Sequence, residues 1–347
     1  MISDDTLREG LQAPGMSLTI DEKLEIAGIL SESGLRTALV SYPSAHSSEI
    51  EVTREIVKKK LFRETYALGR TLEQDIDMID STGADIALHL PFRFEGTSEI
   101  MKAVKYASGK GKIVEVAVVD VIKYGEEMLE KLCSVLVEAG TDILQLPDTT
   151  GLANPDRFEQ IVSSMRKRFK DVEIEIHCHN DSGLSAANAI AGIRAGADRV
   201  DTTVYGLGER NGITDQMVLA TYLENSGIKT GIDMKKLSLV YDRVLELILK
   251  KMGSEFFAKS YPIIGGNVRV HTAGTHAAFS DVFHAEEFSV NVYAGKSMVR
   301  RILENSGMRT TDEQLSEIVK KIKDRAVETG MSLKTKEIRE IAGETVG

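Results

Sequence analysis

Residues 141–181 read TDILQLPDTTGLANPDRFEQIVSSMRKRFKDVEIEIHCHND, and this stretch decides the fold. Two runs rich in branched apolar residues, TDILQLPD and VEIEIHCH, have the length and composition of β-strands. Between them, NPDRFEQIVSSMRKRF repeats apolar residues at helical spacing, and Asn154 followed by Pro155 is typical of a helix start. The stretch therefore predicts one strand–helix–strand unit.

The same alternation of apolar runs and amphipathic segments extends over residues 1–230. Because a helical pattern follows each run, the predicted fold is α/β, a (β/α)8 TIM barrel. A doubly wound open sheet is the competing solution, but no GxGxxG motif follows the first strand. The candidate strands begin near Ile2, Leu35, Leu61, Ala84, Lys112, Thr141, Val172 and Ala197.

The alternation stops after Gly227, and the rest of the chain has mainly helical periodicity. Segments such as MKKLSLVYDRVLELILKKMG and TDEQLSEIVKKIKDRAVETG are too long and too apolar for a linker. We therefore expect a helical C-terminal subdomain over residues 231–347, which acts as a lid and dimerisation region. No regulatory domain is expected beyond it.

Composition excludes several classes of protein. The 347 residues carry 43 Lys and Arg against 53 Asp and Glu, with no dense basic run, so no nucleic-acid partner is expected. Apolar runs are far shorter than the roughly 20 residues that span a bilayer, so we expect no membrane association. The opening MISDDTLREG is unlike a signal peptide, and two cysteines cannot build a disulfide framework. These features predict a cytoplasmic location.

Polar motifs follow the predicted strands, where a TIM barrel carries its active site. Strand alternation puts His177 and His179 on one face and turns Cys178 toward the surrounding helices. Two imidazoles with a carboxylate from a neighbouring strand end, Glu9, form a facial metal site with open positions. A hydrogen-bonded histidine pair is the alternative, but the nearby carboxylate of Asp5 favours a metal.

Four motifs resemble the DRE-TIM metallolyase superfamily: DDTLREG, LPDTTGLANP, IHCHND and GLGERNGIT. Within it, the sequence is similar to the alpha-isopropylmalate synthase family, which includes 2-isopropylmalate, citramalate and homocitrate synthases. The likeness covers most of the barrel and extends to HTAGTH in the C-terminal part.

The resemblance implies roles for individual residues. Glu9, His177 and His179 would bind a divalent metal (Mg, Mn or Zn) that holds the carboxylate and keto oxygen of a 2-oxo acid. Arg8 would stabilise negative charge developing on that oxygen, and Thr149 would bind the substrate carboxylate.

The resemblance also implies residues farther from the metal. His276 matches a histidine that the synthases contribute from the partner subunit to proton transfer, so a homodimer is expected. Tyr66 and Arg70 on the third strand look like the isopropylmalate and citramalate pattern. Glu209 and Asn211 of GERNGIT complete the expected substrate-binding set.

The fifth strand departs from the family pattern. Where homocitrate synthases carry Arg, Ser and Glu facing inward, this sequence has Glu115, Ala117 and Val119. An anion in place of the cation would repel a distal carboxylate, so a small or apolar 2-oxo acid is expected. Val119 leaves the acid–base role open, and a bulge or one-residue slip could present Asp120 instead.

The implied function is that of an acyltransferase for amino-acid biosynthesis. It would condense acetyl-CoA with a 2-oxo acid and release CoA and a 2-hydroxy dicarboxylic acid. One alternative is a lyase that cleaves hydroxymethylglutaryl-CoA, although GLGERNGIT lacks the cysteine of those relatives. The other is a catalytically impaired protein that binds 2-oxo acids, suggested by Val119 and by Phe288, which lacks a hydroxyl where the synthases carry a hydroxylated ring.

Overall fold

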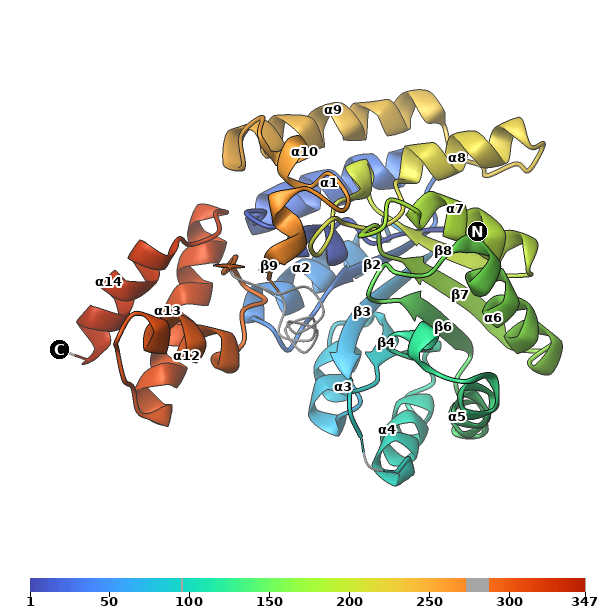
Figure 1. The fold of residues 1–347 in the computed structure, drawn as a ribbon, viewed down its shortest axis with the longest axis horizontal. Coiled ribbons are helices and arrows are strands. Elements are labelled where there is room, and N and C mark those ends of the chain that lie inside the picture. The colour runs from blue at the N-terminus through green and yellow to red at the C-terminus, as the bar shows by residue number, and fades with distance from the viewer. Residues whose placement is uncertain (95, 273–286, 347) are drawn as a thin grey trace.

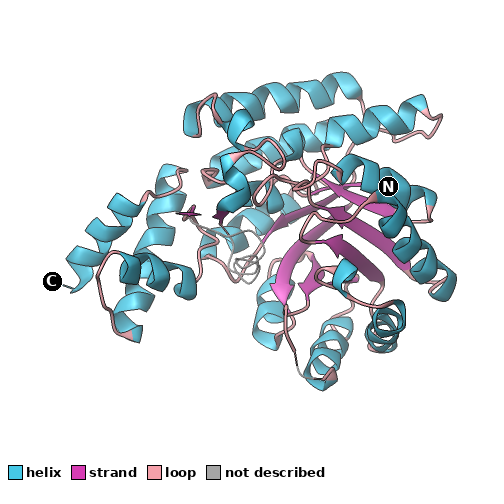
Figure 2. Cartoon of the chain, in the orientation of Figure 1, coloured by secondary structure: helices cyan, strands magenta, loops and turns pink. Residues whose placement is uncertain are grey.

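The computed structural model describes residues 1–94, 96–272 and 287–346. Strands β1 to β8 form a closed parallel barrel in sequence order, with helices α1 to α8 around it (Figure 1, Figure 2), so the predicted (β/α)8 fold is confirmed. The strands are β1 (Ile2–Asp4), β2 (Thr37–Ser41), β3 (Glu64–Arg70), β4 (Asp85–His89), β5 (Val114–Ala117), β6 (Ile143–Asp148), β7 (Glu173–Cys178) and β8 (Arg199–Thr202). The helices are α1 (Ile20–Glu32), α2 (Ser47–Lys58), α3 (Glu73–Asp80), α4 (Ser98–Ser108), α5 (Glu126–Glu138), α6 (Pro155–Arg168), α7 (Ser185–Arg194) and α8 (Gln216–Asn225).

The stretch that predicted the fold forms β6, α6 and β7. The Asn154 side chain accepts a hydrogen bond from the Arg157 N–H at 2.9 Å, and Pro155 begins the helix. Cys178 is fully buried in the main hydrophobic core, as alternation along β7 predicts. Local capping and strand periodicity therefore fix this unit.

The interior of the barrel is unusually polar below its C-terminal end. Gln145 on β6 donates to Glu115 on β5 at 2.8 Å and to Asp201 on β8 at 2.9 Å. Burial raises the pKa of Glu115, Asp201 and the neighbouring Glu175, because a carboxylate charge is costly where little water can solvate it. Arg199 closes the other end through an ion pair with Glu64 at 2.6 Å.

The C-terminal part packs in two different ways. Helix α9 (Met234–Lys251) lies against α1 and shares the hydrophobic core of the barrel. A second core lies within residues 290–342, at the side of the barrel near α2 (Figure 1). The predicted boundary at residue 231 stays a prediction. The other elements are α10 (Phe256–Lys259), β9 (Val270–His271), β10 (Glu287–Phe288), α12 (Lys296–Asn305), α13 (Asp312–Thr329) and α14 (Thr335–Val346).

Specific hydrogen bonds hold the second core against the mouth of the barrel. Buried Asn291 donates to the carbonyl oxygens of Leu11 and Met16 at 2.8 and 2.9 Å. Nε2 of His46, which precedes α2, lies 2.9 Å from Oδ1 of Asp324 on α13. The helical part is therefore fixed beside the loops that follow β1 and β2. In the described part of the chain, no helix has the length and apolar character needed to cross a bilayer.

Gly212, in the loop after β8, lies against the backbone of Gly206, so a side chain at this position should destabilise the protein. Gly212 and Gly227 have nearly equal positive φ angles, 81° and 80°. A Cβ on Gly212 would lie 1.8 Å from the Gly206 carbonyl oxygen, whereas a Cβ on Gly227 would meet nothing within 4 Å. Gly212→Ala should lower the free energy of unfolding by at least about 2 kcal/mol more than Gly227→Ala, because only the former adds a backbone clash to the φ strain. Equal losses in urea unfolding would contradict this packing.

Candidate metal centre and active-site cavity

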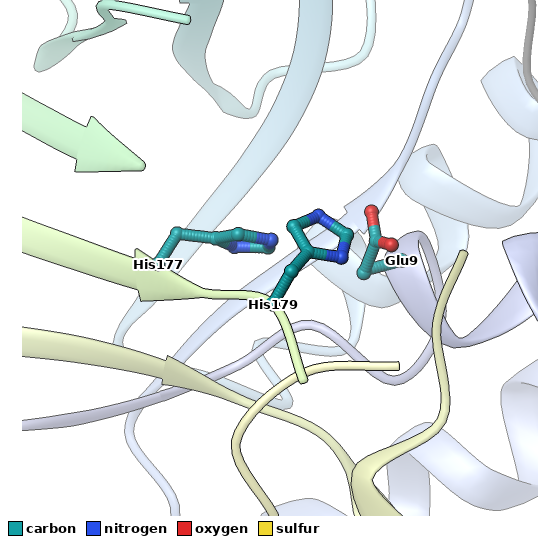
Figure 3. A group of neighbouring side chains, drawn as sticks. All are labelled: Glu9, His177 and His179. Atoms are coloured by element: carbon teal, nitrogen blue, oxygen red, sulfur yellow. The ribbon is translucent and has the colours of Figure 1, made fainter. Parts of the chain in front are cut away.

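Glu9, His177 and His179 converge at the C-terminal end of the barrel. One ligand atom from each lies within 4.8 Å of the others, and all three residues are buried. Figure 3 shows the two rings turned toward the carboxylate of Glu9. His177 is on β7 and His179 lies just beyond it on the same face, while Glu9 begins the turn that follows β1. Period-two alternation and the short loop after β1 therefore produce the group.

The neighbours of His177 prepare it to coordinate a metal. Its Nδ1 lies 3.0 Å from Oδ2 of Asp201, so a proton on Nδ1 leaves Nε2 as the ligand atom. Burial lowers the pKa of His177 to about 4. The ring is therefore neutral at pH 7, which is the form that binds metals.

Hydrogen bonds also hold Glu9 and Arg8 in place. Glu9 Oε1 accepts the Glu209 N–H at 2.9 Å, and Oε2 accepts Arg8 Nη1 at 2.6 Å. The guanidinium of Arg8 also makes two bonds to the carboxylate of Asp5, one of them from Nε at 3.1 Å. The guanidinium of Arg8 therefore holds the carboxylates of Asp5 and Glu9 together through charge-assisted hydrogen bonds.

The donor set suits a divalent cation. Two imidazole nitrogens and one carboxylate oxygen leave open positions on the cavity side for ligands. A second group, Asp5, His177 and Asp201, also brings its ligand atoms within 4.8 Å of one another. Neither Asp5 nor Asp201 lines the cavity, and Asp201 already lies against Nδ1 of His177. The set containing Glu9 is the better metal site, because it offers two imidazole nitrogens and faces the cavity.

A cavity of about 310 Å³ opens beside the three side chains. This is within the size range of small-molecule sites. Its wall includes side chains from the loops after β1 and β2, from the ends of β3 to β7 and the residues just beyond them, and from the C-terminal part of the chain. The lining residues are Arg8, Glu9, Gln12, Tyr42, Ser44, Ala45, Leu68, Arg70, His89, Ala117, Val119, Gln145, Pro147, Thr149, His177, His179, Tyr293, Ala294, Gly295 and Lys323.

Three of the residues predicted to bind substrate, Arg8, Thr149 and Arg70, line this cavity. The Thr149 hydroxyl oxygen accepts the Asp120 N–H at 2.9 Å, so its own proton points elsewhere and can reach a ligand. Arg70 binds Asp75 through Nε at 2.8 Å and Nη2 at 2.7 Å, and about half of its side chain is exposed. Thr149 and Arg70 therefore lie on the same cavity as the proposed metal ligands.

Tyr66 does not reach the cavity. Leu68 and Arg70 occupy the next two inward positions on β3 and form the cavity wall, so Tyr66 lies lower in the barrel. Its hydroxyl oxygen is 3.4 Å from Oε2 of Glu64 and 3.4 Å from Nη1 of Arg199, near the N-terminal end of the barrel. Tyr66 was predicted to contact substrate, but it does not line the cavity. The sequence identified the inward face of β3 and not how far along the barrel axis the side chain lies.

Asp120 is also placed away from the cavity. Strand β5 ends at Ala117, and Val119 lines the cavity. Asp120 has a left-handed φ of 56°, and its carboxylate accepts the Thr150 hydroxyl at 3.2 Å. The slip that would have presented Asp120 to substrate is not observed.

Polar side chains of the loop after β8 make hydrogen bonds to the backbone of residues 260–272. The Glu209 carboxylate accepts the Thr272 N–H at 2.9 Å and lies 3.1 Å from Nδ1 of His271. Asn211 donates to the carbonyl oxygens of Ser260 and Tyr261 at 3.0 and 3.1 Å. Neither side chain lines the cavity, whereas the backbone N–H of Glu209 supports Glu9. His276 lies outside the described residues.

The inward-facing residues of β5 lie at different depths relative to the cavity. Glu115 faces the interior as predicted, but Ala117 and Val119 form the cavity wall above it. Gln145 donates to Glu115, and burial raises the pKa of this carboxyl. Burial therefore disfavours a negative charge on Glu115, and its side chain does not line the cavity.

Sequence reasoning missed several residues of the wall. His89 ends β4, and the strand-end rule could have found it. Lys323 and Tyr293 come from the C-terminal part, and their sequence positions carry no signal that they would meet the barrel mouth.

A family model named HMGL-like matches residues 1–244, more than half of the chain. The chain belongs to the HMGL-like family. The 2-isopropylmalate synthase of Sulfolobus acidocaldarius is 32% identical over 369 residues, which cover 98% of this chain and 94% of that protein. The homocitrate synthase of the same organism is 31% identical over 353 residues, 93% of this chain and 74% of that protein.

Solved structures agree on the fold of this HMGL-like chain. The HMG-CoA lyase of Bacillus subtilis matches with a TM-score of 0.65 at 22% identity, covering 73% of this chain and 93% of that one. At this identity the match supports the barrel alone. The resemblance inferred from the four strand-end motifs is therefore confirmed at the level of the family.

Removing one imidazole tests the metal centre. His179→Ala should weaken the binding of Mn²⁺ or Zn²⁺ by more than about 100-fold, because it removes a direct ligand. His89→Ala is the matched control, since His89 lines the same cavity outside the ligand group. Isothermal titration calorimetry measures both affinities. Similar affinities in the two variants would contradict the ligand assignment.

Proposed function

We propose that this protein is a metal-dependent enzyme that condenses acetyl-CoA with a 2-oxo acid. The observation that carries the proposal is the single cavity shared by Arg8, Thr149 and the candidate ligands Glu9, His177 and His179. Relatives named 2-isopropylmalate synthase and homocitrate synthase, each covering more than 90% of this chain, support the same chemistry.

The residues have distinct tasks in this reaction. A bound divalent cation would supply a Lewis acid and a template for the 2-oxo acid. Thr149 donates a hydrogen bond to the substrate carboxylate. Arg8 lies beside Glu9 and places a permanent positive charge where the keto oxygen becomes negative.

The atoms balance as in a Claisen condensation followed by hydrolysis. The acetyl methyl group loses a proton, and its carbon forms a bond to the keto carbon. The keto oxygen gains a proton and becomes the hydroxyl group. Water then cleaves the thioester, which releases the CoA thiol and a new carboxylate.

Proton transfer needs a group other than Asp120. His276 is our candidate, contributed by the partner subunit of a homodimer, since a histidine titrates near neutral pH. His89 lines the cavity and is the candidate within the described residues. Burial lowers its pKa, so its ring is neutral and able to accept a proton.

A free-thiol assay tests the proposal. We expect purified protein with acetyl-CoA and Mg²⁺, Mn²⁺ or Zn²⁺ to release CoA thiol when a suitable 2-oxo acid is added, and chelation with EDTA to abolish this release. The panel includes pyruvate, 2-oxoisovalerate, oxaloacetate and 2-oxoglutarate. Absence of thiol release with every acid and metal would contradict the proposal.

Arg8→Gln tests charge stabilisation in the same assay. The variant should lower kcat by about 10²- to 10³-fold, the usual effect of removing one group that stabilises a developing oxyanion. Arg309→Gln, at an exposed position of the helical part, should leave kcat unchanged. A kcat for Arg8→Gln within about threefold of the wild-type value would show that Arg8 has no such role.

A further inference from the structure

Lys323 brings a cation from the helical part into the wall of the cavity. It lies on α13, and its Nζ donates to the Ala45 carbonyl oxygen in the loop after β2 at 2.7 Å. No carboxylate of residues 1–94, 96–272 or 287–346 is recorded in an ion pair with it. Glu49 is the nearby anion, but it already binds Lys23 at 2.5 Å and the Tyr293 hydroxyl at 3.0 Å.

Lys323 is on the far side of the cavity from the histidines. In the closed barrel, β3 is four strands from β7 in either direction, so the two strands face each other. Arg70 ends β3, and Lys323 is bound to the adjacent loop after β2. The cations Arg70 and Lys323 therefore face His177 and His179 across the cavity.

The two cations of the far wall differ in their partners among the described residues. Arg70 is neutralised by Asp75 through two hydrogen bonds. Within the described residues Lys323 has a carbonyl oxygen as its hydrogen-bond partner, and burial lowers its pKa to about 8. A desolvated ammonium group in this position gains from a bound anion, because the anion replaces the lost hydration.

Apolar side chains form part of the wall of the cavity. Leu68, Ala117, Val119 and Pro147 line it together with the polar Tyr42, His89 and Gln145. Methylene groups suit the apolar part, whereas a carboxylate at each end suits the charged groups. Glu115 does not line the cavity, and burial raises the pKa of its carboxyl.

We propose that the substrate is a 2-oxodicarboxylic acid, whose distal carboxylate binds Nζ of Lys323 while its 2-oxo acid end occupies the metal centre. This inference rests on the proposed function and specifies its substrate class. It reverses the expectation of an apolar substrate drawn from the fifth strand. Lys323 is then the residue that determines specificity, since Arg70 nearby is paired with Asp75.

The test compares two classes of substrate in wild-type and variant protein. We expect wild-type kcat/KM for 2-oxoglutarate or oxaloacetate to exceed that for pyruvate and 2-oxoisovalerate by at least about tenfold. Lys323→Met should lower this ratio by about tenfold or more, and Lys323→Arg should restore part of it. Lys320→Met, an exposed lysine on the same helix, should leave the ratio unchanged.

The ratio cancels any general loss of folded enzyme, because both classes are measured on the same preparation. Preference of the wild type for monocarboxylic acids, or an unchanged ratio in Lys323→Met, would overturn the inference while leaving the proposed function intact. Absence of thiol release from every acid would overturn the proposed function. In that case, calorimetry in the presence of Mg²⁺ tests the substrate class separately. The ratio of the affinities for 2-oxoglutarate and 2-oxoisovalerate should then fall in Lys323→Met, and an unchanged ratio would contradict the role of Lys323.

Discussion

The site depends on the hydrogen bonds that hold the Glu9 carboxylate against His177 and His179 at the mouth of the barrel. Arg8 donates to one carboxylate oxygen of Glu9, and the Glu209 N–H donates to the other. The loop after β8 therefore matters to the metal centre, because its backbone supports Glu9.

Two layers of the barrel have different tasks. The upper layer holds the cavity, and the layer beneath it contains Gln145 with Glu115 and Asp201. Asp201 links the layers, because it also lies against Nδ1 of His177. A carboxyl group in the lower layer can therefore orient His177 without contacting substrate.

The sequence predicted the barrel and the grouping of the candidate metal ligands because both follow from local rules. Strand alternation places His177 and His179 together, and strand-end position adds Glu9. No such rule tells how far a strand residue lies from the C-terminal end of the barrel. For this reason the sequence did not show that Tyr66 and Glu115 lie below the cavity. Lys323 could not be predicted, because the apolar face of α13 gives no information about which barrel loop its polar residues meet.

The central claim is that Glu9, His177 and His179 share one divalent cation. Anomalous diffraction from crystals grown with Zn²⁺ measures this directly. The account predicts one strong peak at about 2.0–2.2 Å from a Glu9 oxygen and from one nitrogen of each histidine. A peak bound by Asp5 and Asp201 instead, or no peak among the three side chains at saturating Zn²⁺, would contradict it.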